Sequence, residues 1–231
     1  YIVVIDKKIM KTLVIIPSRL SAQRLPGKPL MKINGLSIIS HVFKKAKEAN
    51  VGEVIVAAED QEIVDDVKQN GGQAILTKNV HKTGTDRIYE VFQKINTSNI
   101  DLVMNLQGDE PLMNVDDIRN LNKHMAESNS QIGTLASEIH DKTLLENQNV
   151  VKVLTKENLN QTNFPEAENF IRNVSEEKEN IYHHLGIYCY NKDTLEKFVS
   201  FNQSINEIKN KLEQLRALDN KIKINVAFAK F

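Results

Sequence analysis

The chain has 231 residues, enough for one substantial α/β domain with a hydrophobic core, and two independent domains are less expected. Its 30 basic and 30 acidic side chains give a formal net charge of zero, so there is no overall basic field to hold nucleic acid or an anionic membrane. The single cysteine, Cys189, excludes an internal disulfide and a cysteine-rich metal cluster, and no apolar run is long enough to span a membrane. A soluble, reducing compartment fits best.

Apolar runs rich in β-formers alternate along the chain with segments of helical period. This alternation predicts crossover units and an α/β fold with a mainly parallel sheet. The expected strands are Thr12 to Ile16, Glu53 to Ala57, Gln73 to Leu76, Leu102 to Asn105, Ile132 to Glu138, Val150 to Leu154, Tyr182 to Tyr190 and Lys223 to Ala229. The expected helices are Ser37 to Asn50, Gln61 to Asn70, Gly84 to Ile95, Val115 to Ser128, Lys192 to Phe198 and Ile205 to Asp219. The last helix is expected to bury an apolar stripe of Ile205, Ile208, Leu212, Leu215 and Leu218.

Both ends and one internal stretch depart from this alternation. We expect residues 10–231 to form a single domain and residues 1–9 to be an extension without an assigned function, since they lack the features of a secretory signal. Residues 158–180 are polar, contain Pro165 and have no sustained period, which predicts a surface loop or a short excursion from the sheet. The sequence ends directly after a strand-like run, which is typical of a chain that has been cut short.

A basic segment follows the first expected strand. Ligands of parallel sheets bind beyond the carboxyl ends of the strands, so this segment stands where a ligand would. It begins with Pro17 and Ser18 and carries the cations Arg19, Arg24 and Lys28, which suit a polyphosphate. An ordinary solvated loop is the alternative. Neither G-x-G-x-x-G nor G-x-x-x-x-G-K-[ST] occurs, so a phosphate loop here would be of another type.

An acidic turn follows the strand that ends near Asn105. In Gln107-Gly108-Asp109-Glu110-Pro111 the glycine and the proline turn the chain, which leaves Asp109 at the end of the strand and outside the core. A lone carboxylate facing a triphosphate suits Mg²⁺, which completes its shell with water and phosphate oxygens. An Asx-type turn without a metal is the alternative.

Three further segments contain residues that could bind a ligand or a metal ion. Gly84, Thr85 and Arg87 lie at an expected helix N-terminus, which favours an anion or a polar base edge, although for this segment alone an ordinary N-cap followed by a solvated first turn is the preferred explanation. His183 and His184 are neighbours on a strand and point to opposite faces, so we reject a histidine metal site. In Leu212-Glu213-Gln214-Leu215-Arg216, Glu213 alone would pass for a solvated charge.

Several of these motifs together resemble the 3-deoxy-manno-octulosonate cytidylyltransferase (CMP-Kdo synthetase) family. The motifs are Pro-Ser-Arg and Arg-Leu-Pro-Gly-Lys-Pro-Leu within 17–30, His-x-x-Gly-Thr-Asp-Arg at 81–87, Gln-Gly-Asp-Glu-Pro at 107–111, His-Leu-Gly-Ile-Tyr at 184–188 and Leu-Glu-Gln-Leu-Arg at 212–216. They occur in the family's order, and the resemblance extends over residues 10–231.

The resemblance implies a Mg²⁺-dependent transferase that couples CTP to 3-deoxy-manno-octulosonate (Kdo). It implies a Rossmann-like nucleotidyltransferase sheet with a small excursion for dimerisation and sugar binding, and a cytoplasmic homodimer that supplies CMP-Kdo for lipopolysaccharide. Carried over by motif, the catalytic residues are Arg19, Lys28 and Asp109, with Asp109 as metal ligand. The nucleotide-binding residues are Pro17, Ser18, Arg19, Arg24, Lys28, Gly84, Thr85 and Arg87. The residues for the sugar acid are Gln107, His184, Tyr188, Glu213 and Gln214.

The sequence departs from the family pattern in two places. The family's Phe-Ser-Arg-x-x-Ile-Pro stretch has only partial counterparts, at Asn163-Phe164-Pro165 or Phe170-Ile171-Arg172. The closing Val-Asp-Thr-x-x-Asp-Leu, which carries a second metal ligand, is absent from the sequence. The two departures leave open a catalytically weak nucleotide-binding remnant. The other alternative is a cytidylyltransferase for another sugar acid such as a sialic acid, which would share the first loop, although Gln-Gly-Asp-Glu-Pro and His-Leu-Gly-Ile-Tyr favour Kdo.

Overall fold

The computed structural model describes residues 9–21, 25–78, 81–174 and 178–230. Its main sheet has nine strands in this part of the chain, ordered β11-β7-β10-β6-β1-β4-β5, with β8 paired to β10 and β9 paired to β8. The strands are β1 Thr12–Ser18, β4 Gly52–Ala58, β5 Ala74–Leu76, β6 Leu102–Asn105, β7 Ile132–Ser137, β8 Lys152–Thr155, β9 Ala167–Ile171, β10 Ile181–Asn191 and β11 Ile224–Phe228. A separate pair joins β2 Lys32–Ile33 to β3 Leu36–Ser37.

The strand directions confirm the predicted fold class. Strands β6, β1, β4 and β5 are mutually parallel, and β11 is parallel to β7. Strand β10 runs antiparallel to both β6 and β7, which makes β7 and β11 parallel to the first group. The chain thus forms a mostly parallel sheet with one reversed strand inside it.

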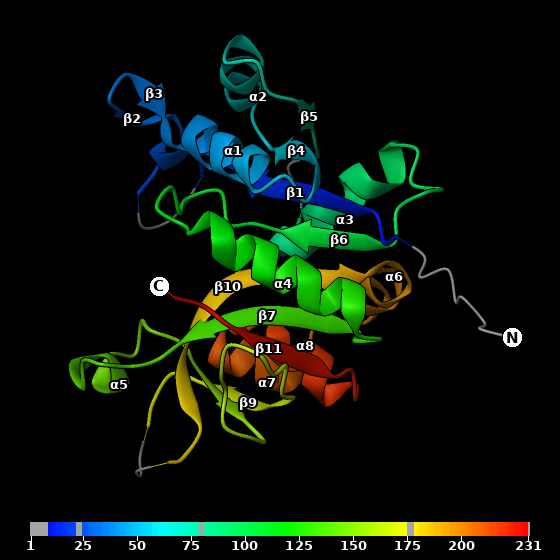
Figure 1. The fold of residues 1–231 in the computed structure, drawn as a ribbon. Helices are drawn as coiled ribbons and strands as arrows, with labels where there is room; N and C mark the ends of the chain where they lie inside the picture. The colour runs from blue at the N-terminus through cyan, green and yellow to red at the C-terminus, as the bar shows by residue number, and fades with distance from the viewer. Residues whose placement is uncertain (1–8, 22–24, 79–80, 175–177, 231) are drawn as a thin grey trace, which may run out of the picture.

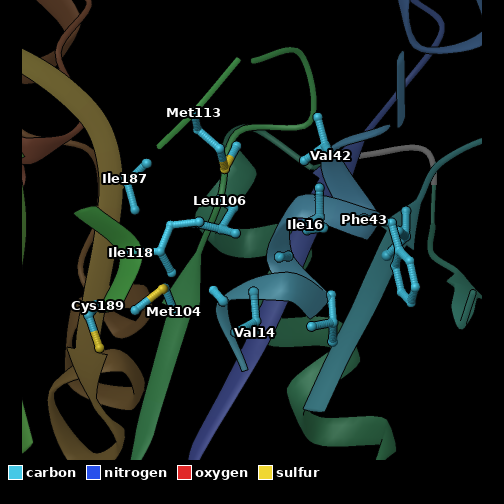
Figure 2. Close-up of a cluster of buried hydrophobic side chains, with 14 of the residues drawn as sticks. Val14, Ile16, Val42, Phe43, Met104, Leu106, Met113, Ile118, Ile187 and Cys189 are labelled. Carbon is cyan, nitrogen blue, oxygen red and sulfur yellow. The ribbon is translucent and has the colours of Figure 1, made fainter. Parts of the chain in front are cut away.

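Helices cover both faces of this sheet (Figure 1). They are η1 Lys28–Leu30, α1 Ile38–Ala49, α2 Gln61–Gln69, α3 Gly84–Lys94, α4 Val115–Glu127, α5 Thr143–Glu146, α6 Lys192–Ser200, α7 Ile205–Asn210 and α8 Gln214–Asp219. The apolar stripes of α1, α2 and α4 pack on one face, and those of α3, α6 and α8 pack on the other. Figure 2 shows part of the first core, where Val14 and Ile16 of β1 and Met104 of β6 meet Val42 of α1 and Ile118 of α4.

The connections place a crevice beside β1. Strand β1 leads through α1 to β4 and then through α2 to β5, whereas the next crossover, through α3, returns the chain to β6 on the other side of β1. Strand order therefore reverses at β1, and ligands of open α/β sheets bind outside the carboxyl ends of the strands at such a reversal. The segments after β1 and β6 meet there.

The predicted helix Ile205 to Asp219 is wrong as a single element. The chain breaks after α7, where Lys211 has a left-handed backbone (φ 53°), and resumes in α8. The predicted apolar stripe fails with it, because Ile205 and Ile208 are 85% and 61% exposed while Leu212 and Leu215 are buried. Arg216 instead folds back to donate to both carboxylate oxygens of Glu207, at 2.8 and 2.6 Å.

The polar stretch 158–180 contains an element that the sequence did not reveal. Residues Ala167–Ile171 form β9, which pairs antiparallel with β8 and extends the sheet beyond β10. The alternation in β9 is weak, with Ala167 and Phe170 buried and Glu168 and Asn169 exposed. The predicted excursion from the sheet is therefore confirmed in part. Strand β9 and most of the loop between β8 and β9 belong to the stretch 158–180, and β9 adds to the sheet by pairing with β8.

Candidate active site

A cavity of about 330 Å³ lies at the crevice beside β1, and we call it the basic cavity. Its lining comes from the end of β1, from η1, from the start of α3 and from the turn after β6. The lining residues are Pro17, Ser18, Arg19, Lys28, Pro29, His81, Lys82, Thr83, Gly84, Arg87, Gln107, Gly108 and Asp109. The structure thus brings together most of the residues that the sequence predicted for the nucleotide, together with Gln107 and Asp109.

Two glycines lie where the walls of this cavity converge on Pro17, and the close approach requires glycine at one of them. A Cβ added to Gly108 would lie 2.7 Å from the Pro17 carbonyl oxygen, so only glycine lets the turn after β6 pass this close to β1. A Cβ on Gly84 would be in ordinary contact with the Pro17 ring, at 3.5 Å. The backbone of three separate segments therefore reaches one point at the base of the cavity.

Charged side chains of opposite sign face each other across the basic cavity. Lys28 donates to Asp109 Oδ2 at 3.0 Å, and the two side chains are 31% and 54% exposed. Arg19 is exposed at the rim. Arg24, which the sequence places in the same group of cations, lies outside the described residues. The pair between Lys28 and Asp109 is solvent-exposed, so it contributes little to stability and is open to exchange with a ligand.

Arg87 lies at the cavity but its guanidinium is engaged by protein groups. It donates to Thr77 Oγ1 at 2.5 Å and to the Lys78 carbonyl oxygen at 3.1 Å, and it pairs with Glu59. Burial lowers the pKa of Arg87, with Glu59 opposing the shift and Arg19 adding to it. Arg87 thus supports the cavity wall in this structure, and the sequence had assigned it to nucleotide binding.

Thr85 does not line the basic cavity. It is buried at the start of α3, and its hydroxyl lies 3.4 Å from the Tyr190 hydroxyl on β10. This contact points to a second group, which joins three of the residues predicted for the sugar acid to Tyr190, a residue that the sequence analysis did not assign. Tyr188, Tyr190, Glu213 and Gln214, which we call the tyrosine–glutamate cluster, surround a space of only about 10 Å³.

The tyrosine–glutamate cluster is buried and electrostatically unusual. Burial raises the pKa of Glu213, and the nearby Thr85 and Arg216 act in the opposite direction without cancelling this effect. Glu213 Oε1 is buried and has no hydrogen-bond partner in the described part of the chain. Burial also raises the pKa values of Tyr188 and Tyr190, so both phenols stay protonated.

His184, another residue predicted for the sugar acid, lies beside this cluster. Its ring is 5.5 Å from that of Tyr188, and its Nε2 is 2.9 Å from Thr134 Oγ1. Burial, assisted by the adjacent His183, lowers the pKa of His184 to about 3, so the imidazole is neutral at physiological pH. It can serve there as a hydrogen-bonding group without a charge.

Gln107 connects the two groups. It lines the basic cavity, and its Nε2 donates at 3.0 Å to the carbonyl oxygen of Gly186. Gly186 lies in β10 where the register with β7 shifts between Leu185 and Tyr188. Gln107, which was predicted to bind the sugar acid, thus lies between the basic cavity and the strand that carries His184 and Tyr188.

The structure also places the two partial counterparts of the missing Phe-Ser-Arg motif. Arg172 donates to the carbonyl oxygens of Gln148, Asn210 and Lys211 at 3.1 to 3.2 Å, which ties the end of β9 to the break between α7 and α8. The Phe164 ring stacks on His124 of α4, with centroids 4.9 Å apart. Neither side chain lines the basic cavity.

Sequence reasoning missed five residues that line the cavity, namely Pro29, His81, Lys82, Thr83 and Gly108. It also missed Glu59 and Glu90, which bind side chains that support the cavity wall. His81 belonged to a motif already recognised, so its position was available as a signal. Glu59 directly follows β4 and Glu90 lies in the middle of α3. At such positions the sequence does not distinguish a glutamate that is buried and paired from one that is exposed to solvent.

The chemistry of the cavity is compatible with Mg²⁺. Asp109 offers one half-exposed carboxylate next to a volume open to water and phosphate, which is the kind of donor set that magnesium accepts. Within the described residues there is no group of three or more histidine, cysteine, aspartate or glutamate side chains that could hold a metal ion by itself. Most ligands would therefore come from water and substrate.

Comparison with known proteins agrees with this geometry. A family model described as cytidylyltransferase matches residues 13–224. A 3-deoxy-manno-octulosonate cytidylyltransferase of Rhodopseudomonas palustris (strain BisB18) is 42% identical over 224 residues, covering 94% of this chain and 88% of that protein. One of Afipia carboxidovorans is 42% identical over 217 residues, covering 93% and 87%.

Solved structures show the same relationship. A CMP:2-keto-3-deoxy-manno-octonic acid synthetase complexed with CTP has a TM-score of 0.85 and 34% identity, covering 95% of this chain and 90% of that one. A 4-diphosphocytidyl-2C-methyl-D-erythritol synthase from Anaerococcus prevotii has a TM-score of 0.62 at 11% identity, covering 96% and 90%, and shares the fold.

The fold and the cavity at its strand reversal define a nucleotidyltransferase of the cytidylyltransferase class. Identity of about two residues in five over nearly the whole chain then narrows the assignment. The chain belongs to the 3-deoxy-manno-octulosonate cytidylyltransferase family.

Proposed function

We propose that this protein transfers the cytidylyl group of CTP to the anomeric hydroxyl of Kdo, with release of pyrophosphate. The observation that carries the proposal is the basic cavity at the strand reversal, in a chain whose relatives bear this activity in their names. A polyphosphate fits beside Arg19 and Lys28, and a sugar acid next to Gln107 would lie beside the nucleotide.

In this reaction no protein nucleophile is needed. The anomeric oxygen of the sugar attacks the α-phosphorus, and the bond from that phosphorus to the bridging oxygen of the β-phosphate breaks with its electron pair left on the pyrophosphate. The hydroxyl proton passes to solvent water. Arg19, Arg24 and Lys28 hold phosphate oxygens and offset the charge that builds up on the leaving pyrophosphate. Lys28 pairs with Asp109 before substrate arrives, and the triphosphate supplies the anion that replaces this carboxylate.

Magnesium dependence is part of the proposal. Asp109 would hold the ion, which when bound neutralises phosphate charge and orients the triphosphate. Gly84, Thr85 and Arg87 shape the cytidine side of the site, Arg87 through its support of residues 77 and 78. Gln107, His184, Tyr188, Glu213 and Gln214 are proposed for the sugar acid, with the last three in the closed cluster.

A cytoplasmic homodimer that supplies lipopolysaccharide synthesis completes the proposal, on the support of family resemblance. No helix in the described residues has the length and apolar character needed to cross a membrane.

The test is pyrophosphate release with Mg²⁺ and each of CTP, UTP and ATP, against Kdo and a sialic acid. We expect turnover with CTP and Kdo that exceeds every other pair by at least about a hundredfold, the scale on which a misplaced reacting group slows an enzyme. Higher turnover with the sialic acid than with Kdo would show that the proposed acceptor is wrong and that the enzyme acts on a sialic acid. Binding of CTP without turnover on either acid would indicate a nucleotide-binding remnant.

A further inference from the structure

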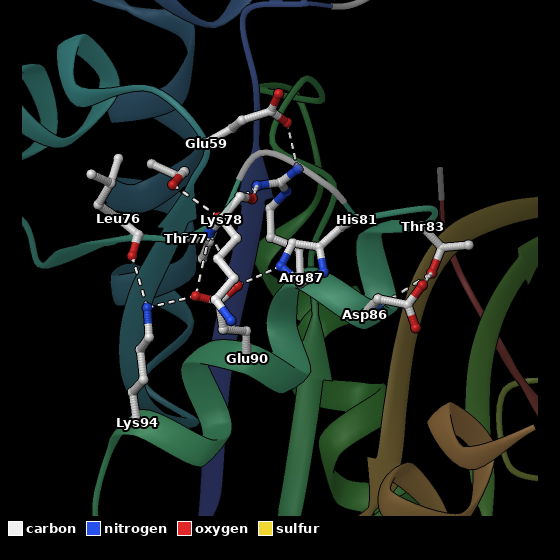
Figure 3. Close-up of polar contacts among 11 residues, drawn as sticks. Glu59, Leu76, Thr77, Lys78, His81, Thr83, Asp86, Arg87, Glu90 and Lys94 are labelled. Carbon is white, nitrogen blue, oxygen red and sulfur yellow. Dashed lines mark hydrogen bonds and ion pairs between the residues drawn. The ribbon is translucent and has the colours of Figure 1, made fainter.

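One face of α3 holds the chain segment that precedes it (Figure 3). Arg87, Glu90 and Lys94 are spaced i, i+3 and i+7, so their side chains lie along one side of the helix. Arg87 bonds to Thr77 and Lys78, as described, and Lys94 Nζ donates to the Leu76 carbonyl oxygen at 3.2 Å. The backbone at 76–78 is therefore attached to α3 from two points.

Glu90 lies between these two points and accepts three donors. Its Oε1 accepts from Lys94 Nζ at 2.5 Å, and its Oε2 accepts from the backbone N–H of Lys78 at 3.1 Å and from His81 Nε2. The Glu90 side chain is 12% exposed. Burial acts to raise its pKa, but hydrogen bonds from Lys94, His81 and Lys78 outweigh burial and lower the pKa to about 2. The carboxylate is therefore ionised throughout the working pH range.

His81 extends this arrangement to the basic cavity. It lines the cavity together with Lys82, and its side chain is 15% exposed. A neutral imidazole that donates through Nε2 carries an acceptor at Nδ1, so the partner at Nε2 sets both the tautomer and the ring orientation. Glu90 supplies that partner, although it is not itself a lining residue.

We infer that Glu90 is a positioning residue for the nucleotide, acting through His81 and the backbone N–H of Lys78. The inference rests on the proposed function, because it takes the basic cavity as the CTP site. It concerns a side chain outside the motifs that the sequence analysis used. Glutamine is a poor substitute, since its NH₂ group would face a donor where Glu90 presents an oxygen.

The test compares CTP binding, measured by calorimetry without a sugar acid, in wild type, Glu90→Gln, His81→Ala and the double variant. We expect Glu90→Gln to weaken CTP binding by about three- to tenfold, the range that loss of one or two net hydrogen bonds allows. The double variant should bind CTP no more weakly than the single variant with the lower CTP affinity, because both substitutions disrupt the same contact between Glu90 and His81. In turnover, KM for CTP should rise while kcat stays within about twofold of wild type.

Lys94→Gln is the matched control. This substitution removes Lys94, another partner of Glu90, whose side chain is 45% exposed and does not line the cavity. Any loss of CTP affinity in Lys94→Gln therefore reports only the general loss of structure around Glu90. Both single variants of α3 should melt below wild type, but only Glu90→Gln should lose CTP affinity.

Three outcomes overturn the inference. They are unchanged CTP affinity in a folded Glu90→Gln variant, an equal loss in Lys94→Gln, and fully additive losses for Glu90 and His81. A wild-type protein that fails to bind CTP would instead contradict the proposed function, and this is seen before any variant is made.

Discussion

The ion pair of the basic cavity is exposed to solvent, whereas the carboxyl group of the tyrosine–glutamate cluster is buried. The basic cavity measures about 330 Å³, and its ion pair of Lys28 and Asp109 is open to water. The space inside the tyrosine–glutamate cluster measures about 10 Å³, and burial there raises the pKa of Glu213. A hydrated cavity can exchange its internal ion pair for a ligand at small cost, whereas a buried carboxyl must find a hydrogen-bond donor or stay protonated.

The support behind the two regions differs in the same way. The tyrosine–glutamate cluster is backed by Arg216 and Glu207, which are 2% and 3% exposed and joined by two hydrogen bonds. Arg216 also lies over the Phe198 ring, 4.7 Å from its centroid. Loss of either charge would leave the other buried, so we expect the cluster to depend on this pair for stability and the basic cavity to depend on charge for binding.

The largest expected effect is on stability. Arg216→Met should lower the free energy of unfolding by about 3 to 5 kcal/mol, because Glu207 is left as a buried charge without its main partner. Lys156→Met, which breaks the more exposed pair with Glu166, should cost about 1 kcal/mol or less. Urea unfolding of the three proteins makes the comparison, and equal midpoints would remove the distinction between buried and exposed pairs.

The next effect is on turnover. Asp109→Asn keeps the shape of the turn and removes the charge proposed for the metal, so kcat should fall about a hundredfold or more, which is close to 3 kcal/mol in the barrier. The melting temperature should hardly change, because Asp109 is 54% exposed. Pyrophosphate release across a magnesium titration measures this change. Wild-type activity at saturating magnesium would exclude Asp109 as the ligand.

The third effect is on CTP affinity. Arg19→Ala should weaken CTP binding by roughly 1.5 to 3 kcal/mol, the range for hydrogen bonds to charged groups, and Arg24→Ala is predicted from the sequence to do the same. The Arg19→Ala variant should unfold like wild type, since Arg19 is exposed. Calorimetry with CTP at two salt concentrations is the measurement. Unchanged affinity in a folded variant would remove that arginine from the phosphate site.

The smallest effects concern pH, and they have opposite signs in the two regions. The folded pKa of Glu90 is about 2, below its ordinary value of 4.5, so its stabilisation is present above pH 4.5 and is lost as the pH falls toward 2. Glu90→Gln should therefore cost about 1 to 3 kcal/mol at neutral pH and progressively less in acid.

For Glu213 the folded pKa is raised, so the wild type loses stability as the pH rises through the unfolded pKa toward the folded one. The Glu213→Gln variant should thus become more stable relative to the wild type as the pH rises above 4.5, by about 1 kcal/mol or less, the scale of one hydrogen-bonding group. Urea unfolding of both variants at several pH values checks the signs. Parallel pH profiles for the two variants would contradict the contrast between the regions.

Local patterns in the sequence determined the alternation of strands and helices, the α/β class and the place of the basic segment. Strand β1, helix α1 and strand β6 appear within two residues of their predicted ends, because side-chain period is a local property. The motifs around Lys28, Gly84 and Asp109 follow expected strands or precede an expected helix, and the sheet brings them to one cavity. Their roles in binding and catalysis stay predictions.

Only the tertiary structure decided what lies around Glu213 and Glu90. A straight helix would separate Glu207 from Arg216 by about 13 Å along its axis, so their contact requires the break at Lys211, which hydrophobic period does not reveal. The contact between Thr85 and Tyr190 joins residues 105 positions apart. Glu90 reads as an exposed helical charge until the fold places Lys78, His81 and Lys94 around it. The burial of a charged side chain and the partners that it contacts depend on segments that are distant in the sequence, so the local sequence pattern does not predict them.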